Sequence, residues 1–214
     1  MFKNKFVIGL IVAVIVGVIG YTFLGEETTV SEADYAAEMA QERKDKDKFF
    51  RDSEESPFRK TGDFKGINYF SPSSIYKVTA TVVPYHATDK KVNVPMTDGT
   101  TVAYEKYGFA EFTLPGESAA ADLNVYRLLI YKHESGLSIL FRDATAPKET
   151  YGGGRYLDFK LEDVNDGKLA IDFNKAYNPY CAYNHEYSCP IPPKENTLPV
   201  RIEAGEKLYY QANE

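Results

Sequence analysis

The sequence lacks most of the residues and motifs that carry common reaction chemistry. Its 214 residues include no Trp, 2 Cys and 3 His. It contains no nucleophile elbow, no H-E-x-x-H zinc motif, no P-loop and no dinucleotide fingerprint. The sequence therefore names no reaction, and we expect no cofactor.

Clusters of basic residues are also lacking. The formal net charge is −6 and the isoelectric point is about 5.2. A protein that binds nucleic acid neutralises phosphates with grouped Lys and Arg side chains. We therefore expect no nucleic-acid partner.

One long apolar run stands near the start of the chain. Lys3 and Lys5 precede an uncharged stretch from Phe6 to Leu24. At about 1.5 Å per residue, a helix of this length spans about 28 Å, close to the ~30 Å hydrocarbon core of a bilayer. The run predicts a single membrane-spanning helix over residues 6–24. By the positive-inside rule, the two lysines predict a cytoplasmic N-terminus and a body outside the cytoplasm, in the periplasm or at the cell surface.

A cleaved signal peptide is the alternative interpretation of this segment. Its apolar run would be shorter, and Val18–Gly20 matches a small-residue cleavage site only weakly. We therefore divide the chain into a transmembrane anchor or signal peptide (1–25), a charged helix with a linker (26–60) and a β-rich domain (61–214).

The charged segment after the anchor predicts an amphipathic helix. Ser31 followed by Asp34 is a variant of the capping box, and good helix formers dominate to about Asp52. The apolar seam is thin and strongest at Phe49 and Phe50, through which we expect the helix to dock on the body. The charge run "ERKDKDK" is typical of a solvated face.

The remainder of the chain follows a β pattern. Tyr and Phe dominate the aromatic residues (17 and 13), and both suit half-buried pleated surfaces. Short alternating segments recur with Gly and Pro between them, including one hairpin around Glu134–Gly136 and a turn at Asp166–Gly167 between "GRYLDFKL" and "KLAIDFN". "LPVRIEAG" and "EKLYY" are expected to be the last strands. The predicted fold is mainly β, an antiparallel β-sandwich or small β-barrel, preceded by the transmembrane helix and the charged helix.

Four blocks of the sequence carry a resemblance to a known family. They are "FRDATAPKETYGGGRYLDF" (Phe141–Phe159), "IDFNKAYNPYCAY" (Ile171–Tyr183), "SCPIPPKENTLPV" (Ser188–Val200) and "IEAGEK" (Ile202–Lys207). They resemble the uncharacterised prokaryotic family called domain of unknown function 1684, from about Tyr35 to the C-terminus. The resemblance implies a recognisable module and brings no established activity, cofactor or catalytic residue. The family pattern includes both cysteines and requires no histidine between them.

Those two cysteines, Cys181 and Cys189, flank His185 with the spacing C-x3-H-x3-C. A zinc site needs four ligands, or three and a water, and the other histidines lie on distant strands, so we predict no metal. A catalytic cysteine would need an adjacent base, and only His185 is close in sequence. We predict a disulfide in an exported body, with two packed, reduced thiols as the alternative.

Polar residues at the ends of the late strands form the predicted ligand-binding surface, in the blocks Arg142–Arg155 and Asp172–Asn196. Its residues are Arg142, Asp143, Tyr151, Arg155, Asp172, Asn174 and Tyr177. Arg155 follows Gly152–Gly154, which could bring backbone N–H groups to a ligand but is more typical of a turn that starts a strand.

Three functional hypotheses follow. The first is a membrane-anchored module that binds a small polar ligand or a protein partner at this surface. The second is a hydrolase that uses Asp143 or Asp172 as a general base. The third is a structural or assembly protein in which the same residues only hold loops.

Overall fold

The computed structural model describes residues 31–60, 62–115 and 124–209. The predicted membrane anchor lies outside these ranges. Within them, no helix combines the length and the apolar character needed to cross a membrane.

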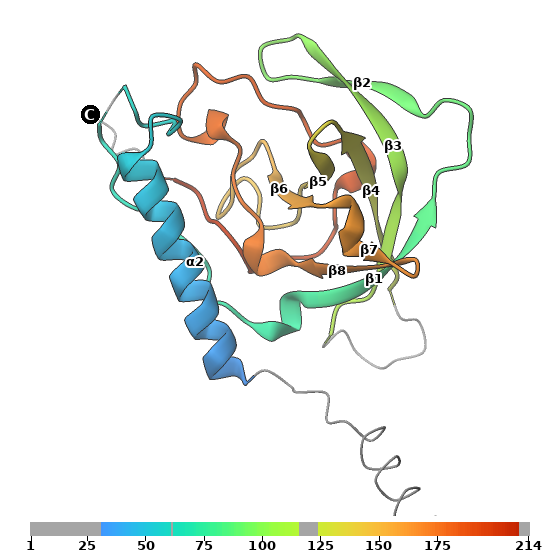
Figure 1. The fold of residues 1–214 in the computed structure, drawn as a ribbon, viewed down its shortest axis with the longest axis horizontal. Coiled ribbons are helices and arrows are strands. Elements are labelled where there is room, and N and C mark those ends of the chain that lie inside the picture. The colour runs from blue at the N-terminus through green and yellow to red at the C-terminus, as the bar shows by residue number, and fades with distance from the viewer. Residues whose placement is uncertain (1–30, 61, 116–123, 210–214) are drawn as a thin grey trace, which may run out of the picture.

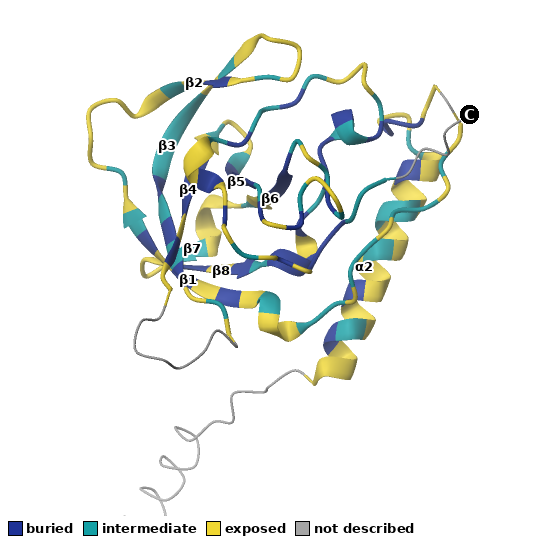
Figure 2. Ribbon diagram, turned by 180° about the vertical axis from the view of Figure 1, so that it is seen from behind, coloured by how far each residue is buried: buried dark blue, intermediate teal, exposed yellow. Residues whose placement is uncertain are grey.

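The predicted charged helix is confirmed as α2 (Glu32–Asp52). Ser31 caps it, because its hydroxyl oxygen accepts a hydrogen bond from the Asp34 N–H at 3.1 Å. Tyr35, Met39 and Phe50 are the buried residues of the helix. Figure 2 shows buried positions along one side of α2 and exposed positions along the other.

The prediction that the charge run is a solvated face does not hold for Arg43 and Lys46. The Arg43 guanidinium lies 4.3 Å from the centre of the Tyr69 ring, and Lys46 Nζ lies 2.7 Å from Glu206 Oε1. Both cations therefore point from α2 toward the body, where the C-terminal segments lie beside the helix (Figure 1).

The mainly antiparallel β fold is confirmed. The described strands are β1 (Lys77–Pro84), β2 (Lys91–Pro95), β3 (Thr101–Phe112), β4 (Tyr126–His133), β5 (Gly136–Phe141), β6 (Arg155–Phe159), β7 (Val164–Asn165) and β8 (Lys168–Asp172). They form one 8-stranded sheet in the order β6-β5-β4-β3-β1-β8-β7, with β2 paired to β3. The strands thus lie in one sheet, whereas a sandwich has two, and the order of the described strands does not close into a barrel.

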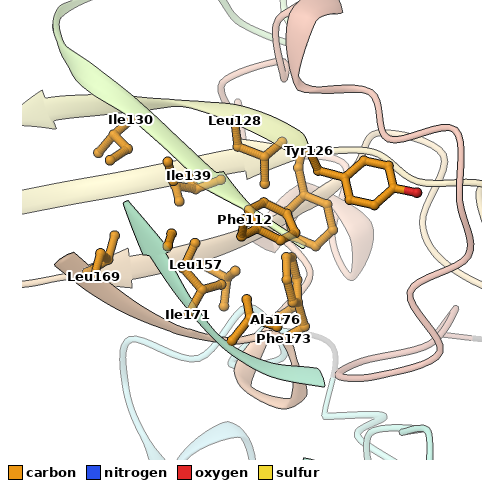
Figure 3. Close-up of a cluster of buried hydrophobic side chains, with 14 of the residues drawn as sticks. Phe112, Tyr126, Leu128, Ile130, Ile139, Leu157, Leu169, Ile171, Phe173 and Ala176 are labelled. Atoms are coloured by element: carbon orange, nitrogen blue, oxygen red, sulfur yellow. The ribbon is translucent and has the colours of Figure 1, made fainter. Parts of the chain in front are cut away.

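The main hydrophobic core lies on one face of this sheet. Alternation in β1 buries Val78, Ala80 and Val82, as the sequence predicts. Leu157 of β6 and Leu169 of β8 belong to the same buried cluster although their strands are far apart in the order. The sheet therefore curls around this core, and Figure 3 shows side chains from several strands pointing to one centre.

Two predictions about late strands need correction. Asp166–Gly167 is a turn with both φ values positive (48° and 69°), but it joins β7 to β8. The strands β6 and β8, which the sequence predicted on either side of it, do not pair. The segment 199–209 does not form ladder strands; an isolated bridge joins Tyr69 to Glu206. Isolated backbone hydrogen bonds, such as that from the Lys207 N–H to the Asn68 carbonyl oxygen at 2.8 Å, and side-chain contacts hold it in place. Both join residues far apart in sequence, so the local pattern does not encode them.

Candidate functional site

Two neighbouring cavities lie between α2 and the segments that follow β8. The first, called the Glu206 pocket, has a volume of about 90 Å³ and is lined by Met39, Glu42, Arg43, Lys46, Tyr69, Asn174, Lys175, Ala176, Tyr177 and Glu206. The second, called the aromatic groove, has a volume of about 460 Å³ and is lined by Lys46, Phe49, Phe50, Tyr156, Tyr177, Pro179, Tyr180, Tyr187, Ser188 and Cys189. Lys46 and Tyr177 belong to both.

The centre of the Glu206 pocket is a buried carboxylate. Glu206 is 1% exposed, and a buried charge is stable only when it is paired and hydrogen-bonded. Its Oε2 accepts hydrogen bonds from the Asn178 N–H at 2.7 Å and from the Tyr183 hydroxyl, while Oε1 lies 2.7 Å from Lys46 Nζ. The chain can place Glu206 here because the preceding residue is Gly205. Its φ is 75°, and a Cβ at this position would lie 2.5 Å from the Ala176 carbonyl oxygen.

Arg43 presents unused hydrogen-bond donors on the same side of α2. Its Nε and Nη2 are buried and have no hydrogen-bond partner among the described residues. Burial lowers the pKa of Arg43, and burial together with Glu206 raises the pKa of Tyr69. Because arginine stays charged in proteins, the free edge of its guanidinium remains suited to a carboxylate, a phosphate or ordered water.

The aromatic groove has a rigid inner wall and a more exposed rim. Phe49 and Tyr187 are each 37% exposed, while Phe50 is 2% exposed. The Tyr180 and Tyr187 rings meet edge to face with their centres 5.2 Å apart. The groove therefore offers ring faces and edges to a planar ligand, with Lys46 as its cation.

The orientation of Tyr177 is fixed from behind the cavities. Its hydroxyl donates to Asp158, whose other oxygen accepts from Ser138, and both bonds are 2.5 Å long. Ser138 Oγ lies 2.7 Å from His133 Nε2. Burial, with Asp158 as the next cause, raises the pKa of Tyr177, so this hydroxyl stays neutral and keeps its bond at neutral pH.

The structure brings together only part of the predicted ligand-binding surface. Asn174 and Tyr177 line the Glu206 pocket. Asp172 supports it from one side, accepting from the Tyr35 hydroxyl at 2.8 and 2.9 Å and from the Asn174 N–H at 3.0 Å. Tyr151 lines a different cavity.

The other three predicted residues hold the fold together. Asp143 and Arg155 form a buried ion pair at 2.7 Å, with both side chains 1% exposed. Arg142 donates to the carbonyl oxygens of Gly152 at 3.1 Å and Pro192 at 3.3 Å. The interpretation of Gly152–Gly154 as a turn before a strand agrees with the structure, where β6 begins at Arg155.

The carboxylates of the hydrolase hypothesis do not meet. Asp143 is bonded to Arg155, Thr145 and the backbone of Ile202. The contacts of Asp172 are with Tyr35 and Asn174, and neither aspartate lines the Glu206 pocket or the aromatic groove. The pair therefore does not provide a shared general-base site.

Both cysteines are free and buried, so the predicted disulfide is not formed in this structure. The Cys181 N–H donates to Cys189 Sγ at 3.2 Å, which places the second thiol beside the first residue. His185, between them in sequence, is exposed. Across the described ranges, no group of three or more His, Cys, Asp or Glu is placed to hold a metal ion.

Sequence reasoning did not assign Arg43, Lys46, Tyr69 and Glu206 to the site, and it also missed the aromatic-groove residues Tyr156, Tyr180 and Tyr187. The first two were hidden in a charge run, and a helix face is assigned only once its partner is known. The available signal was that Glu206 directly follows Gly205 in one of the family blocks.

A family model described as "Protein of unknown function (DUF1684)" matches residues 62–207. The chain belongs to the DUF1684 family. Among solved structures, the chain is similar to an uncharacterised protein of Haloarcula marismortui determined by NMR in solution. The two share 34% sequence identity with a TM-score of 0.59, over 82% of this chain and 95% of the other. No curated protein matches the chain.

The residues matched by the DUF1684 model form only one side of the candidate site. Tyr69, Asn174, Tyr177 and Glu206 lie within residues 62–207, whereas α2 precedes them. Arg43 and Lys46 therefore come from a helix outside the matched range, whereas Lys175 of the Glu206 pocket lies within it.

Proposed function

We propose that this DUF1684 protein is a binding module for a small aromatic ligand that carries an anionic group. The ring lies in the aromatic groove and the anionic group contacts Lys46. The observation that supports this most directly is a groove of about 460 Å³ with six aromatic side chains and one ammonium group. Sites for small molecules have volumes of about 300–1,000 Å³, mostly apolar walls and a few polar groups that orient the ligand.

Lys46 keeps donor capacity for such a ligand. An ammonium group has three N–H donors, and the ammonium group of Lys46 forms an ion pair with Glu206 Oε1 at 2.7 Å. The amino group also lies 4.7 Å from the centre of the Tyr177 ring, at the wall that the two cavities share. A carboxylate in the groove would therefore meet a cation that is already held in place.

The hydroxyl of Ser188 is a second polar group of the groove. Its Oγ is buried where the groove meets a third cavity, and Ser188 helps to lower the pKa of Asp98, so its hydroxyl faces that carboxylate. A hydroxyl that donates to a carboxylate keeps its acceptor lone pairs. Lys46 therefore remains the group of the groove that suits an anionic ligand, with Ser188 as an acceptor beside it.

Aryl carboxylates and their neutral amides provide the test. Benzoate, phenylacetate and cinnamate should bind the full chain more tightly than the corresponding amides, measured by NMR titration. Replacing Lys46 by Met should weaken the acids about 10- to 100-fold, the value of a charge-assisted hydrogen bond, and leave the amides nearly unchanged. Lys48→Met is the matched control, because Lys48 is on the same helix and pairs with Asp52 at the surface.

Substitutions at the rim of the groove test ring contacts with the ligand independently of the Lys46–Glu206 ion pair. Phe49→Ala and Tyr187→Ala should weaken acids and amides alike, since both lose ring contacts while Lys46–Glu206 stays intact. If neither series binds, or if both rim variants bind as the parent does, the groove is not the binding site.

We also propose that the body is held outside the cytoplasm by residues 6–24. This rests on the length of the apolar run and on Lys3 and Lys5 before it. The full chain should fractionate with membranes, and protease added outside spheroplasts should digest the body. Recovery of the uncleaved chain in the soluble cytoplasmic fraction would contradict this.

A further inference from the structure

The two cysteines lie between two cavities. Cys189 lines the aromatic groove, whereas Cys181 lines a third cavity of about 210 Å³ together with Thr97, Asp98, Tyr151, His185, Glu186, Tyr187 and Ser188. Each thiol is nearly buried, at 4% exposed for Cys181 and 5% for Cys189. Small molecules can therefore reach the pair through a cavity, whereas bulky ones are kept away.

Hydrogen bonds hold the pair in a fixed arrangement. The Cys181 N–H donates to Cys189 Sγ at 3.2 Å, and the Cys189 N–H donates to Thr97 Oγ1 at 3.0 Å. The Tyr151 hydroxyl lies 3.7 Å from Cys181 Sγ. The two sulfurs are thus neighbours, and one has a hydroxyl donor of its own.

The environment makes the two thiols unequal. Hydrogen bonds from Cys189, Tyr151 and Thr97 lower the pKa of Cys181 against the opposing effect of burial. The same contact with Cys181, followed by burial, raises the pKa of Cys189. Cys181 is thus the more acidic thiol and also the one that lines the third cavity, which favours Cys181 as the nucleophile and Cys189 as its resolving partner.

The third cavity restricts which oxidant can arrive. Asp98 and Glu186 line it, so a negatively charged disulfide such as oxidised glutathione is repelled as well as too large. A small neutral oxidant is neither repelled by these carboxylates nor too large for the cavity. Hydrogen peroxide and short alkyl hydroperoxides are small, neutral oxidants of this kind.

We propose that Cys181 and Cys189 form a hydroperoxide-reactive dithiol, in which Cys181 attacks and Cys189 resolves. This goes beyond ligand binding in the groove and does not depend on it. The Cys181 thiolate attacks the terminal oxygen of the hydroperoxide, the O–O bond breaks, and the alkoxide or hydroxide takes a proton from solvent. Cys181 is then a sulfenic acid. Cys189 Sγ attacks its sulfur, the S–O bond breaks, and the hydroxide leaves as water with the Cys189 proton.

These steps balance as a two-electron reaction. The hydroperoxide is reduced to an alcohol, or to water when it is hydrogen peroxide, and a further water forms in the second step. The two thiols are oxidised to one disulfide, which is the bond that the sequence predicted. The structure, in which both thiols are free, is the reduced form, and the disulfide is the oxidised form.

The test uses the reduced full chain treated with one equivalent of hydrogen peroxide. The intact mass should fall by two hydrogens and both thiols should become unreactive to maleimide. Cys189→Ser should instead gain one oxygen at Cys181, trapped by dimedone. Cys181→Ser should react at least about tenfold more slowly, because the low-pKa thiol is gone.

The dependence on pH gives a second readout. The rate of peroxide consumption should rise with pH with a midpoint below the ordinary pKa of a free thiol, because the pKa of Cys181 is lowered. Tyr151→Phe, which removes one hydrogen bond to the thiolate and little volume, should shift this midpoint upward. Equal rates for Cys181→Ser and the parent, or a parent rate equal to that of the urea-unfolded chain, would overturn the proposal; thermal melts confirm that each variant is folded.

Discussion

Replacing Arg155 by alanine should lower the free energy of unfolding by about 3–5 kcal/mol, the largest loss we expect from a charged residue of this protein. The change removes one partner of a buried ion pair and leaves the Asp143 carboxylate without its cation. Both side chains are 1% exposed, so water cannot take over the lost contact. An uncompensated buried charge costs more than the pair contributes.

Arg155 also organises the C-terminal segment. Its Nη2 donates to the Ile202 carbonyl oxygen at 3.0 Å, and its Nη1 donates to those of Ala204 and Glu206. The segment 199–209 has no strand ladder of its own, so these bonds replace the missing sheet contacts. Because Glu206 lies at the end of this segment, loss of Arg155 should loosen the Glu206 pocket as well.

Chemical denaturation measures this effect against a surface pair. Arg201 bonds Glu149 and Glu203, and its side chain is 47% exposed. Arg201→Ala should leave the free energy of unfolding almost unchanged, because exposed ion pairs contribute little. Equal losses for the two variants would show that the burial of Arg155 does not matter, contrary to our account.

Replacing Phe50 by alanine should cost about 3–5 kcal/mol, the usual range for a buried Phe. Phe50 is 2% exposed and its ring meets those of Phe58, Tyr180 and Tyr183, with centres 5.8, 6.0 and 5.2 Å away. The variant would leave a cavity at the point where α2 docks. The free energy of unfolding from urea denaturation is the measurement.

Phe49 provides a control from the adjacent position. Its ring lies 5.9 Å from that of Phe50 but is 37% exposed, so Phe49→Ala should change stability much less than Phe50→Ala. A stable Phe50→Ala protein whose helix signal disappears at low urea, ahead of the sheet, would mean that α2 is a separate attachment. We expect one transition, because α2 supplies buried residues to the body although it precedes the matched DUF1684 range.

The candidate site shows which residues a local sequence pattern can predict. Polar residues that follow strands predicted Asn174 and Tyr177 as site residues, and both line the Glu206 pocket. The same pattern also predicted Asp143 and Arg155, which form an ion pair with each other in the protein interior. A polar residue at a strand end serves a ligand or the fold depending on what packs over it, and that neighbour is distant in sequence.

The sequence alone determined the period-2 alternation of β1, the capped helix α2, the positive-φ turn at Asp166–Gly167 and the DUF1684 blocks, because each depends on residues close together in the chain. The tertiary structure decided the rest: the strand order, the pairing of Lys46 with Glu206, the cavities on either side of the two cysteines and their free thiol state. Those features join residues far apart in sequence, and only the folding of the whole chain sets which of them come within bonding distance.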